Sequence, residues 1–146
     1  MKVLLAVLAF CAVSGSASAQ IMEMNGTWKL NPDRTLGPAP REETLVYKIK
    51  PGEQAYTMDS VEADGRKGHT EWAAKYDGND QPTAGSPGVT VSLRRLDDHT
   101  ELVTNKRNGK VTSTYTRVLV DDGKTIMSVG RDGTNKVIWV RVFERQ

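Results

Sequence analysis

The sequence predicts an all-β fold: an antiparallel up-and-down β-barrel of about nine strands, with no helix in the mature chain apart from single turns. The first observation is that turn signals recur every 9 to 14 residues from Glu43 onward, at the spacing of consecutive hairpins. These signals are Pro51-Gly52, Asp64-Gly65, Asp77-Gly78, Gly85-Ser86-Pro87-Gly88, Asp97-Asp98, Asn108-Gly109, Asp122-Gly123 and Asp132-Gly133. The second is that the segments between the turns alternate apolar and polar residues, as half-buried strands do. No window of a dozen residues after the first 19 shows the apolar stripe of a helix.

The expected strands begin with Gly26–Leu30. Three prolines and one glycine disfavour a helix in Asn31–Pro40, so we predict an irregular connection there. In Tyr56–Ala63 the apolar phase slips near Asp59-Ser60, which predicts a β-bulge. The last strand is predicted over Lys136–Arg145.

Within each later strand, one face carries most of the apolar residues. The residues that share such a face are Leu45, Tyr47 and Ile49; Thr70, Trp72, Ala74 and Tyr76; Val89, Val91 and Leu93; Val111, Ser113, Tyr115, Arg117 and Leu119; and Val137, Trp139, Arg141 and Phe143. We expect these faces to point to the inside of the sheet.

Closure of the sheet into a barrel is favoured for two reasons. A closed barrel removes the two exposed edges that an open sheet must protect. The chain is also poor in apolar residues: they make up 38% of it, but 14 of them lie in Met1–Ala19, and only about 32% of the remaining residues are apolar. The deficit falls on inward positions, namely Ser60, Thr70, Ser113, Arg117 and Arg141, which suit a hydrated cavity better than a solid core.

The first 19 residues have the pattern of a secretory signal peptide. Lys2 precedes the apolar run Val3–Val13, and Ala17-Ser18-Ala19 forms an Ala-x-Ala site, so we expect cleavage after Ala19. The run of 11 apolar residues is about half of what a membrane-spanning helix needs. The prediction is therefore a leader over residues 1–19 and no membrane anchor after its removal.

Residues 20–146 are expected to form one domain, with Gln20–Met24 as a short flexible lead-in. Cys11 is the only cysteine and lies in the leader, so the mature protein forms no disulfide. Secreted eukaryotic domains of this size usually contain disulfides, which favours a bacterial periplasm or the extracellular space. The formal charge of +2 falls by one when Lys2 is removed, which argues against a nucleic-acid partner. We expect a monomer.

Several motifs resemble the calycin superfamily of lipocalins and intracellular fatty-acid-binding proteins, and especially small exported bacterial proteins of lipocalin-like type. They are Gly26-Thr27-Trp28 in the first strand, a basic residue near the end of the last strand, and the order of residues from Leu102 to Arg145. The resemblance implies a ligand-binding barrel in which an inner-strand Arg and an Arg-x-Tyr pair hold a fatty-acid carboxylate. The matching positions are Arg117, Arg141 and Phe143, and Phe143 lacks the hydroxyl group of that pattern.

Arg117 and Arg141 share faces with apolar residues, so both guanidinium groups are expected to point inward. A buried cation is costly unless it is paired. An anionic ligand is one partner, bound through bidentate hydrogen bonds. The alternative is that either arginine stacks on Trp28 or pairs with an internal carboxylate. Tyr115, Trp139, Trp72 and Met58 are the expected apolar lining of the ligand site.

The sequence gives little support for catalysis. His69 and His99 are accompanied by no Ser or Cys motif, and the close ligand spacing of a metal site is absent. Asp97-Asp98 and Asp121-Asp122 lie in turns, where aspartate is favoured for its bonds to the backbone. We therefore predict no enzyme activity, no metal and no cofactor.

Two functions remain open. The first is non-enzymatic binding of a small hydrophobic or amphipathic ligand, with Arg117 and Arg141 as anchors for an anionic, fatty-acid-like end. The second is an exported protein-interaction module or inhibitor whose barrel is filled. The second predicts a packed interior with no cavity of roughly 300–1,000 Å³, the size of a ligand site.

Overall fold

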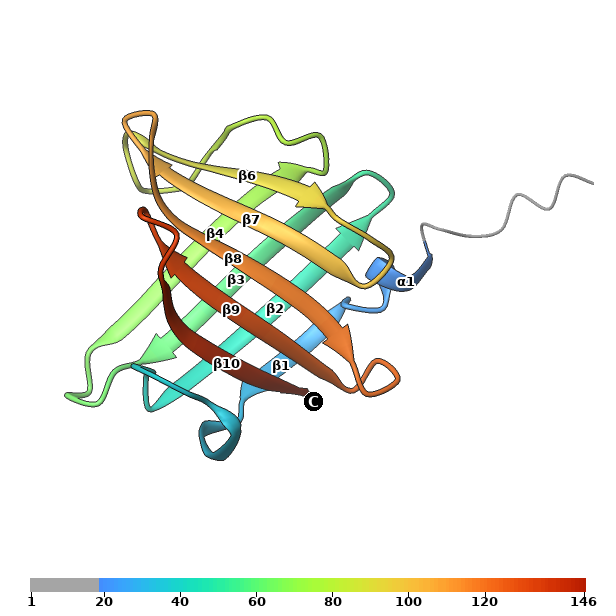
Figure 1. Ribbon diagram of the computed structural model, residues 1–146, viewed down its shortest axis with the longest axis vertical. Helices are drawn as coiled ribbons and strands as arrows, with labels where there is room; N and C mark the ends of the chain where they lie inside the picture. Colours follow the sequence, from blue (N-terminus) through green and yellow to red (C-terminus); the bar gives the residue numbers. More distant parts are fainter. Residues whose placement is uncertain (1–18) are drawn as a thin grey trace, which may run out of the picture.

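The computed structural model describes residues 19–146, which form one antiparallel sheet rolled into a nearly closed barrel (Figure 1). The strands are β1 (Gly26–Leu30), β2 (Glu42–Lys50), β3 (Glu53–Val61), β4 (Lys67–Lys75), β5 (Gln81–Pro82), β6 (Val89–Arg95), β7 (Thr100–Arg107), β8 (Lys110–Val120), β9 (Thr125–Asp132) and β10 (Val137–Arg145). A four-residue helix α1 (Ala19–Met22) precedes β1, and a 3-10 turn covers Pro32–Arg34. The predicted leader lies outside the described residues, except for Ala19.

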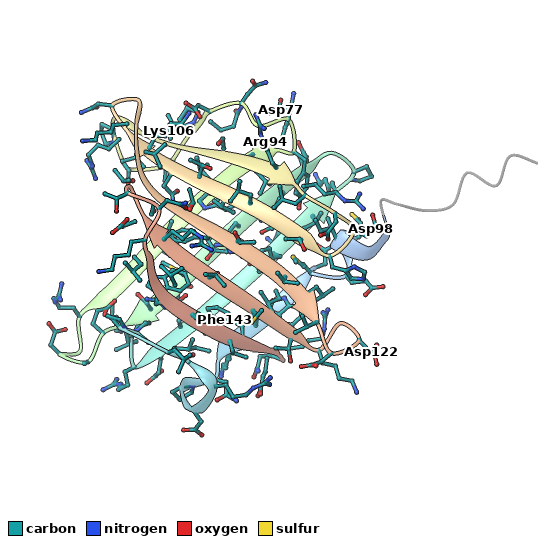
Figure 2. All side chains as sticks on the ribbon, in the orientation of Figure 1. Asp77, Arg94, Asp98, Lys106, Asp122 and Phe143 are labelled. Carbon is teal, nitrogen blue, oxygen red and sulfur yellow. The ribbon has the colours of Figure 1, made fainter. Side chains whose placement is uncertain are left out.

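The strand order is β4-β3-β2-β1-β10-β9-β8-β7-β6-β5, so strands that follow each other in sequence are paired, except β4 and β5, and β1 pairs with β10. The β1–β10 ladder places Trp28 opposite Arg145 and Leu30 opposite Phe143. At the two ends of this order, Asp77 and Arg94 form an isolated bridge, seen side by side in Figure 2. The prediction of an all-β up-and-down barrel is confirmed.

The strand count and the bulge differ from the prediction. The described residues contain ten strands rather than about nine, because β5 has only two residues and is too short to show alternation. The bulge expected near Asp59-Ser60 is wrong, since β3 keeps its register with both β2 and β4. Polar Gln54 and Ser60 share the inward face with Tyr56, which interrupts the apolar pattern but not the backbone pairing. Register shifts occur instead in the β7–β8 and β9–β10 ladders.

One half of the barrel, next to α1, is packed. Its core includes Trp28, which is fully buried. Its indole Nε1 donates a hydrogen bond to the carbonyl of Met24 at 2.8 Å. Ile21 and Met24 are also buried in this core. The expectation of a flexible lead-in is therefore wrong for these residues, which close this end of the barrel.

The segment between β1 and β2 lies against β10 and is irregular, as predicted. The 3-10 turn begins at Asn31, whose side chain accepts a hydrogen bond from the backbone NH of Asp33 at 3.0 Å. Leu36 then pairs with Val140 of β10 through two backbone hydrogen bonds of 2.8 and 2.9 Å. Gly37 has φ +82°, and a Cβ there would lie 2.7 Å from the carbonyl oxygen of Ile138. These contacts hold the segment at the barrel end opposite α1.

Candidate functional site

The half of the barrel away from α1 contains a cavity of about 370 Å³ that is partly open to solvent. This volume lies near the lower end of the range for small-molecule sites, roughly 300–1,000 Å³. Small polar side chains make the space, among them Thr70, Ser113 and Ser128. The loop between β5 and β6 contributes Thr83 and Ser86 to its wall. The barrel is thus packed in one half and open inside in the other.

All seven residues predicted to bind a ligand lie on the wall of this one cavity. They are Met58, Trp72, Tyr115, Arg117, Trp139, Arg141 and Phe143. The structure brings them together because the inward faces of β3, β4, β8 and β10 meet inside a closed barrel. Their part in ligand binding stays a prediction.

Two aromatic pairs line different sides of the cavity. Tyr56 of β3 stacks on Trp72 of β4, with ring centroids 4.8 Å apart and an interplanar angle of 25°. Tyr115 of β8 packs against Trp139 of β10, with centroids 5.3 Å apart. The guanidinium carbon of Arg117 lies between the pairs, 4.4 Å from the Tyr56 centroid and 5.8 Å from that of Tyr115. Tyr56 was not among the predicted site residues, although its alternation with Met58 places it on the same face.

Arg117 is paired with a carboxylate. Its Nη1 lies 3.3 Å from Oε1 of Glu101 on the neighbouring strand β7, and the two side chains are 5% and 0% exposed. Gln54 and Tyr76 complete the network, since the Tyr76 hydroxyl lies 2.6 Å from Gln54 Oε1 and 3.3 Å from Glu101 Oε2. Burial raises the pKa of Glu101, while Arg117 opposes this by stabilising the carboxylate.

Arg141 is paired in the same way. Its Nη1 donates to Oε2 of Glu43 at 2.5 Å, and the side chains are 17% and 4% exposed. The guanidinium carbon stacks 4.4 Å from the centroid of Trp139. Burial raises the pKa of Glu43, and the positive charges of Arg141 and Arg117 act against that shift. The Nε of Arg141 is buried and has no hydrogen-bond partner among the described residues.

Of the arrangements expected for the arginines, the structure contains both carboxylate pairing and stacking on Trp28. Arg117 and Arg141 each pair with an internal carboxylate, and a third arginine stacks on Trp28. This is Arg145, whose guanidinium carbon lies 4.3 Å from the Trp28 ring centroid. Its side chain also donates to the backbone carbonyls of Glu23, Asn25 and Gly123.

Glu43 and Glu101 were missed because charged residues in a strand are usually solvent-facing. Alternation was the available signal. Glu43 is in phase with Leu45, and Glu101 is in phase with Val103.

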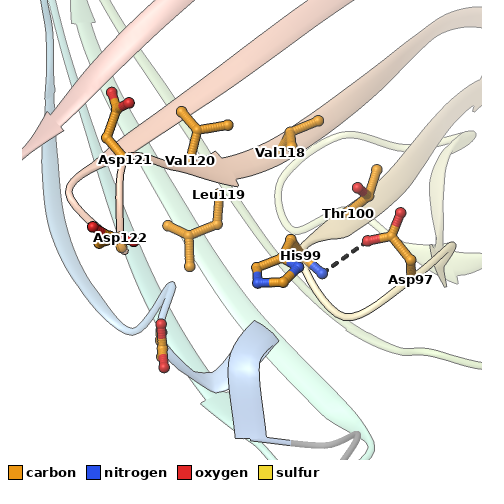
Figure 3. A pocket seen from close by; sticks show the side chains of 10 residues that line it. Asp97, His99, Thr100, Val118, Leu119, Val120, Asp121 and Asp122 are labelled. Carbon is orange, nitrogen blue, oxygen red and sulfur yellow. Dashed lines mark hydrogen bonds between the residues drawn. The ribbon is translucent and has the colours of Figure 1, made fainter.

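A second hollow, of about 720 Å³, lies at the α1 end (Figure 3). It is an open surface depression beside exposed carboxylates, including those of Asp97, Asp121 and Asp122. The backbone NH of His99 donates to Asp97 Oδ1 at 2.8 Å, which lowers the pKa of Asp97. Within residues 19–146, no three His, Cys, Asp or Glu side chains lie together in a way that could hold a metal ion.

The second histidine considered in the sequence analysis, His69, lies on β4, where its Nδ1 is 2.7 Å from Asp59 Oδ1. This ion pair is exposed on the outer face of the barrel. The structure thus places the two histidines on different elements, β4 and the turn between β6 and β7. Within the described part of the chain, no helix is long and apolar enough to cross a membrane.

Comparison with known proteins identifies the fold. No family model matches the chain, and no curated protein matches it. A single-residue mutant of the fluorescent protein UnaG is similar in structure, with a TM-score of 0.63, 18% identity, and coverage of 86% of this chain and 98% of that one. The wild-type UnaG structure gives a TM-score of 0.61 at 18% identity, covering 84% and 96%.

A fatty-acid-binding protein of Schistosoma mansoni, in complex with arachidonic acid, is also similar. Its TM-score is 0.59 at 12% identity, covering 90% of this chain and 99% of that one. These likenesses show the fold alone, an antiparallel β-barrel similar to that of a fatty-acid-binding protein.

Proposed function

We propose that this calycin-type barrel is a non-enzymatic binding protein that holds one small amphipathic molecule in its cavity. The observation that carries the proposal is the unfilled space of about 370 Å³ between two aromatic pairs, in a barrel whose other half is packed. Aromatic walls with a few polar groups are typical of small-molecule sites. The similar Schistosoma mansoni protein in complex with arachidonic acid supports a lipid-like ligand.

The second function, an interaction module with a filled barrel, finds less support. It requires a packed interior, and only the half next to α1 is packed. The cavity of about 370 Å³ in the other half favours a bound molecule instead.

The first test is to extract purified protein with organic solvent and identify any bound molecule by mass spectrometry. The second is a fluorescence titration with N-phenyl-1-naphthylamine, an uncharged probe that emits strongly in apolar sites. The variant Ser113→Phe adds a ring to the cavity wall and is expected to weaken probe binding by about tenfold or more.

Thr114→Phe is the matched control, because it adds the same ring at the next position of β8, on the outer face. Its affinity is expected to stay within about twofold of the unmodified protein. Thermal unfolding of both variants shows whether they fold. A protein that yields no extracted molecule and does not bind the probe would overturn the proposal.

We also propose that the chain is exported as a monomer, with its leader removed after Ala19. Lys2, the apolar run Val3–Val13 and the Ala-x-Ala site support this. Expression of the full chain in a bacterial host should give a periplasmic or secreted protein whose first residue is Gln20, as read by N-terminal sequencing. Sedimentation equilibrium tests whether the exported protein is a monomer in solution. A product that begins at Met1 and stays in the cytoplasm would contradict export.

A further inference from the structure

The two arginines inside the barrel are already paired with buried carboxylates. Arg117 lies 3.3 Å from Glu101, and Arg141 donates to Glu43 at 2.5 Å. An anionic group that reached either guanidinium would have to displace a carboxylate or lie beside it. Both arrangements are unfavourable in a poorly solvated site, because the first leaves a buried charge without its partner and the second brings two like charges together.

The cavity wall carries one more arginine, Arg107, which has no such partner. Arg107 is the last residue of β7, where it is in phase with the inward-facing Glu101, and it is an exposed part of the cavity wall. Figure 2 shows the preceding residue, Lys106, at the end of the barrel away from α1. None of the ion pairs within residues 19–146 includes Arg107, and residues 1–18 contain no Asp or Glu. The mouth of the cavity therefore has a cation that no carboxylate pairs with.

The β7–β8 hairpin places a second cation beside Arg107. Lys110 is its Cα partner across the turn, so the two side chains start from the same face of the hairpin. Lys110 is exposed and takes part in none of these ion pairs within residues 19–146. Like charges directly opposite each other in a ladder destabilise it. A bound anion would relieve this repulsion.

The hairpin is held against the loop before β6. The backbone NH of Asn108 donates to the carbonyl of Gly88 at 2.8 Å. Gly88 has φ +73°, and a Cβ there would lie 2.4 Å from Asn108 Oδ1, so the close approach requires glycine. This contact fixes the backbone next to Arg107 at the mouth.

The carboxylate of the neighbouring β9–β10 turn is bonded within that turn. Asp132 pairs with Ser113 of β8 in the ladder. Its Oδ1 accepts hydrogen bonds from the backbone NH groups of Thr134 at 2.9 Å and Lys136 at 3.1 Å. The positive charge of Lys136 also acts on Asp132 and contributes to its lowered pKa. This turn therefore balances its own charge and leaves that of Arg107 available.

We propose that Arg107 anchors the anionic end of an amphipathic ligand at the mouth of the cavity, with Lys110 beside it. The anionic end is a carboxylate, sulfate or phosphate group, which the planar guanidinium binds through two parallel hydrogen bonds. This inference rests on the proposed function, because it names the charge and the anchor of the molecule in the same cavity.

The ligand then lies with its charged end outward. Arg107 is six residues beyond Glu101 on β7, which is about 20 Å along a strand. A charge at the mouth thus stays far from the Arg117–Glu101 pair, and the apolar part extends inward between the aromatic pairs. This orientation is the reverse of the one implied by the resemblance, in which the inner arginines hold the carboxylate.

The test is displacement of N-phenyl-1-naphthylamine at neutral pH and low salt by decyl sulfate and by decanol, which share one alkyl chain and differ in charge. Arg107→Gln should weaken decyl sulfate binding by about fivefold or more and leave decanol within about twofold. Arg107→Lys keeps the charge and should recover most of the affinity. In the unmodified protein, added salt should weaken binding of decyl sulfate but not of decanol, because exposed charges are screened.

Lys106→Gln is the matched control. It removes the same charge from the preceding residue of β7, whose Nζ pairs with Asp80 at 2.9 Å and which does not line the cavity. Both affinities should stay within about twofold of the unmodified protein. Thermal unfolding shows whether each variant folds.

The outcomes separate the two proposals. If the probe does not bind, the proposed function fails. If the probe binds but decyl sulfate does not displace it, or displaces it equally well at low and high salt, the inference is wrong. It is also wrong if Arg107→Gln loses no more affinity for decyl sulfate than Lys106→Gln does. A loss seen in Arg141→Gln but not in Arg107→Gln would place the anion at the inner pair instead.

Discussion

Replacing Glu101 with glutamine should destabilise the protein far more than breaking a similar pair at the surface. Glu101 is 0% exposed and holds Arg117, which is 5% exposed. Removing one partner of a buried ion pair costs about 3–5 kcal/mol, because the other charge stays buried without compensation. The Tyr56 ring, 4.4 Å from the guanidinium carbon, offsets about 1 kcal/mol of this. We therefore expect Glu101→Gln to lower the free energy of unfolding by about 2–4 kcal/mol.

The assay is urea unfolding at neutral pH, followed by tryptophan fluorescence. With a slope of about 2 kcal/mol/M, the midpoint should fall by about 1–2 M. The control is Asp64→Asn, which breaks the exposed Arg66–Asp64 pair of 2.7 Å and should leave the midpoint unchanged. Adding Arg117→Met to Glu101→Gln removes the stranded charge and should restore most of the lost stability. A Glu101→Gln midpoint equal to that of the control would refute the reasoning.

Two further predictions follow from the packed end and from Glu43. Met24→Ala should lower the free energy of unfolding in urea by about 2–5 kcal/mol, because Met24 is fully buried. A loss near zero would support the original expectation that Gln20–Met24 is a flexible lead-in. Burial raises the pKa of Glu43 from its ordinary value of 4.5; Arg141 of β10 and Arg117 of β8 lower it and Glu62 raises it. Since the folded-state pKa is the higher one, the stability contributed by Glu43 falls as the pH rises from 4.5 through the raised value. Below that raised pKa, Glu43 is neutral and no longer holds Arg141 by charge. The affinity of the unmodified protein for decyl sulfate, which stays anionic, should therefore rise as the pH falls, whereas that of Glu43→Gln should not. An equal response of the two proteins would contradict this prediction.

The strands could be predicted from the sequence because turn chemistry and alternation are local. The first strand, Gly26–Leu30, has the predicted bounds, and the last begins one residue later than expected, at Val137. What failed depends on contacts distant in sequence. Ile21 and Met24 lie in a segment too short to show a period, and their burial depends on the core around Trp28.

The site could be predicted in part for the same reason. Alternation placed six of the seven residues on inward faces, and the nearly closed barrel brings them, together with Met58, to one cavity. Alternation says which way a side chain points, but it does not say which charges meet inside. The partners of Arg117 and Arg141 come from β7 and β2, and the Glu43 contact joins residues 98 positions apart. Alternation therefore could not show that both arginines meet carboxylates inside the barrel.

The position of the Arg117–Glu101 pair explains why the core of the barrel ends where the cavity begins. The pair lies where the packed half meets the cavity, since Arg117 contacts the rings of Tyr47 in the core and Tyr115 on the cavity wall. Apolar residues of similar volume at both positions would be as stable or more so, by the usual behaviour of buried ion pairs. They would also let the core extend into the space above, because nothing polar would need to remain hydrated or bonded there. The charged pair, bonded to Gln54 and Tyr76, therefore ends the apolar packing at that level and leaves the cavity beyond it.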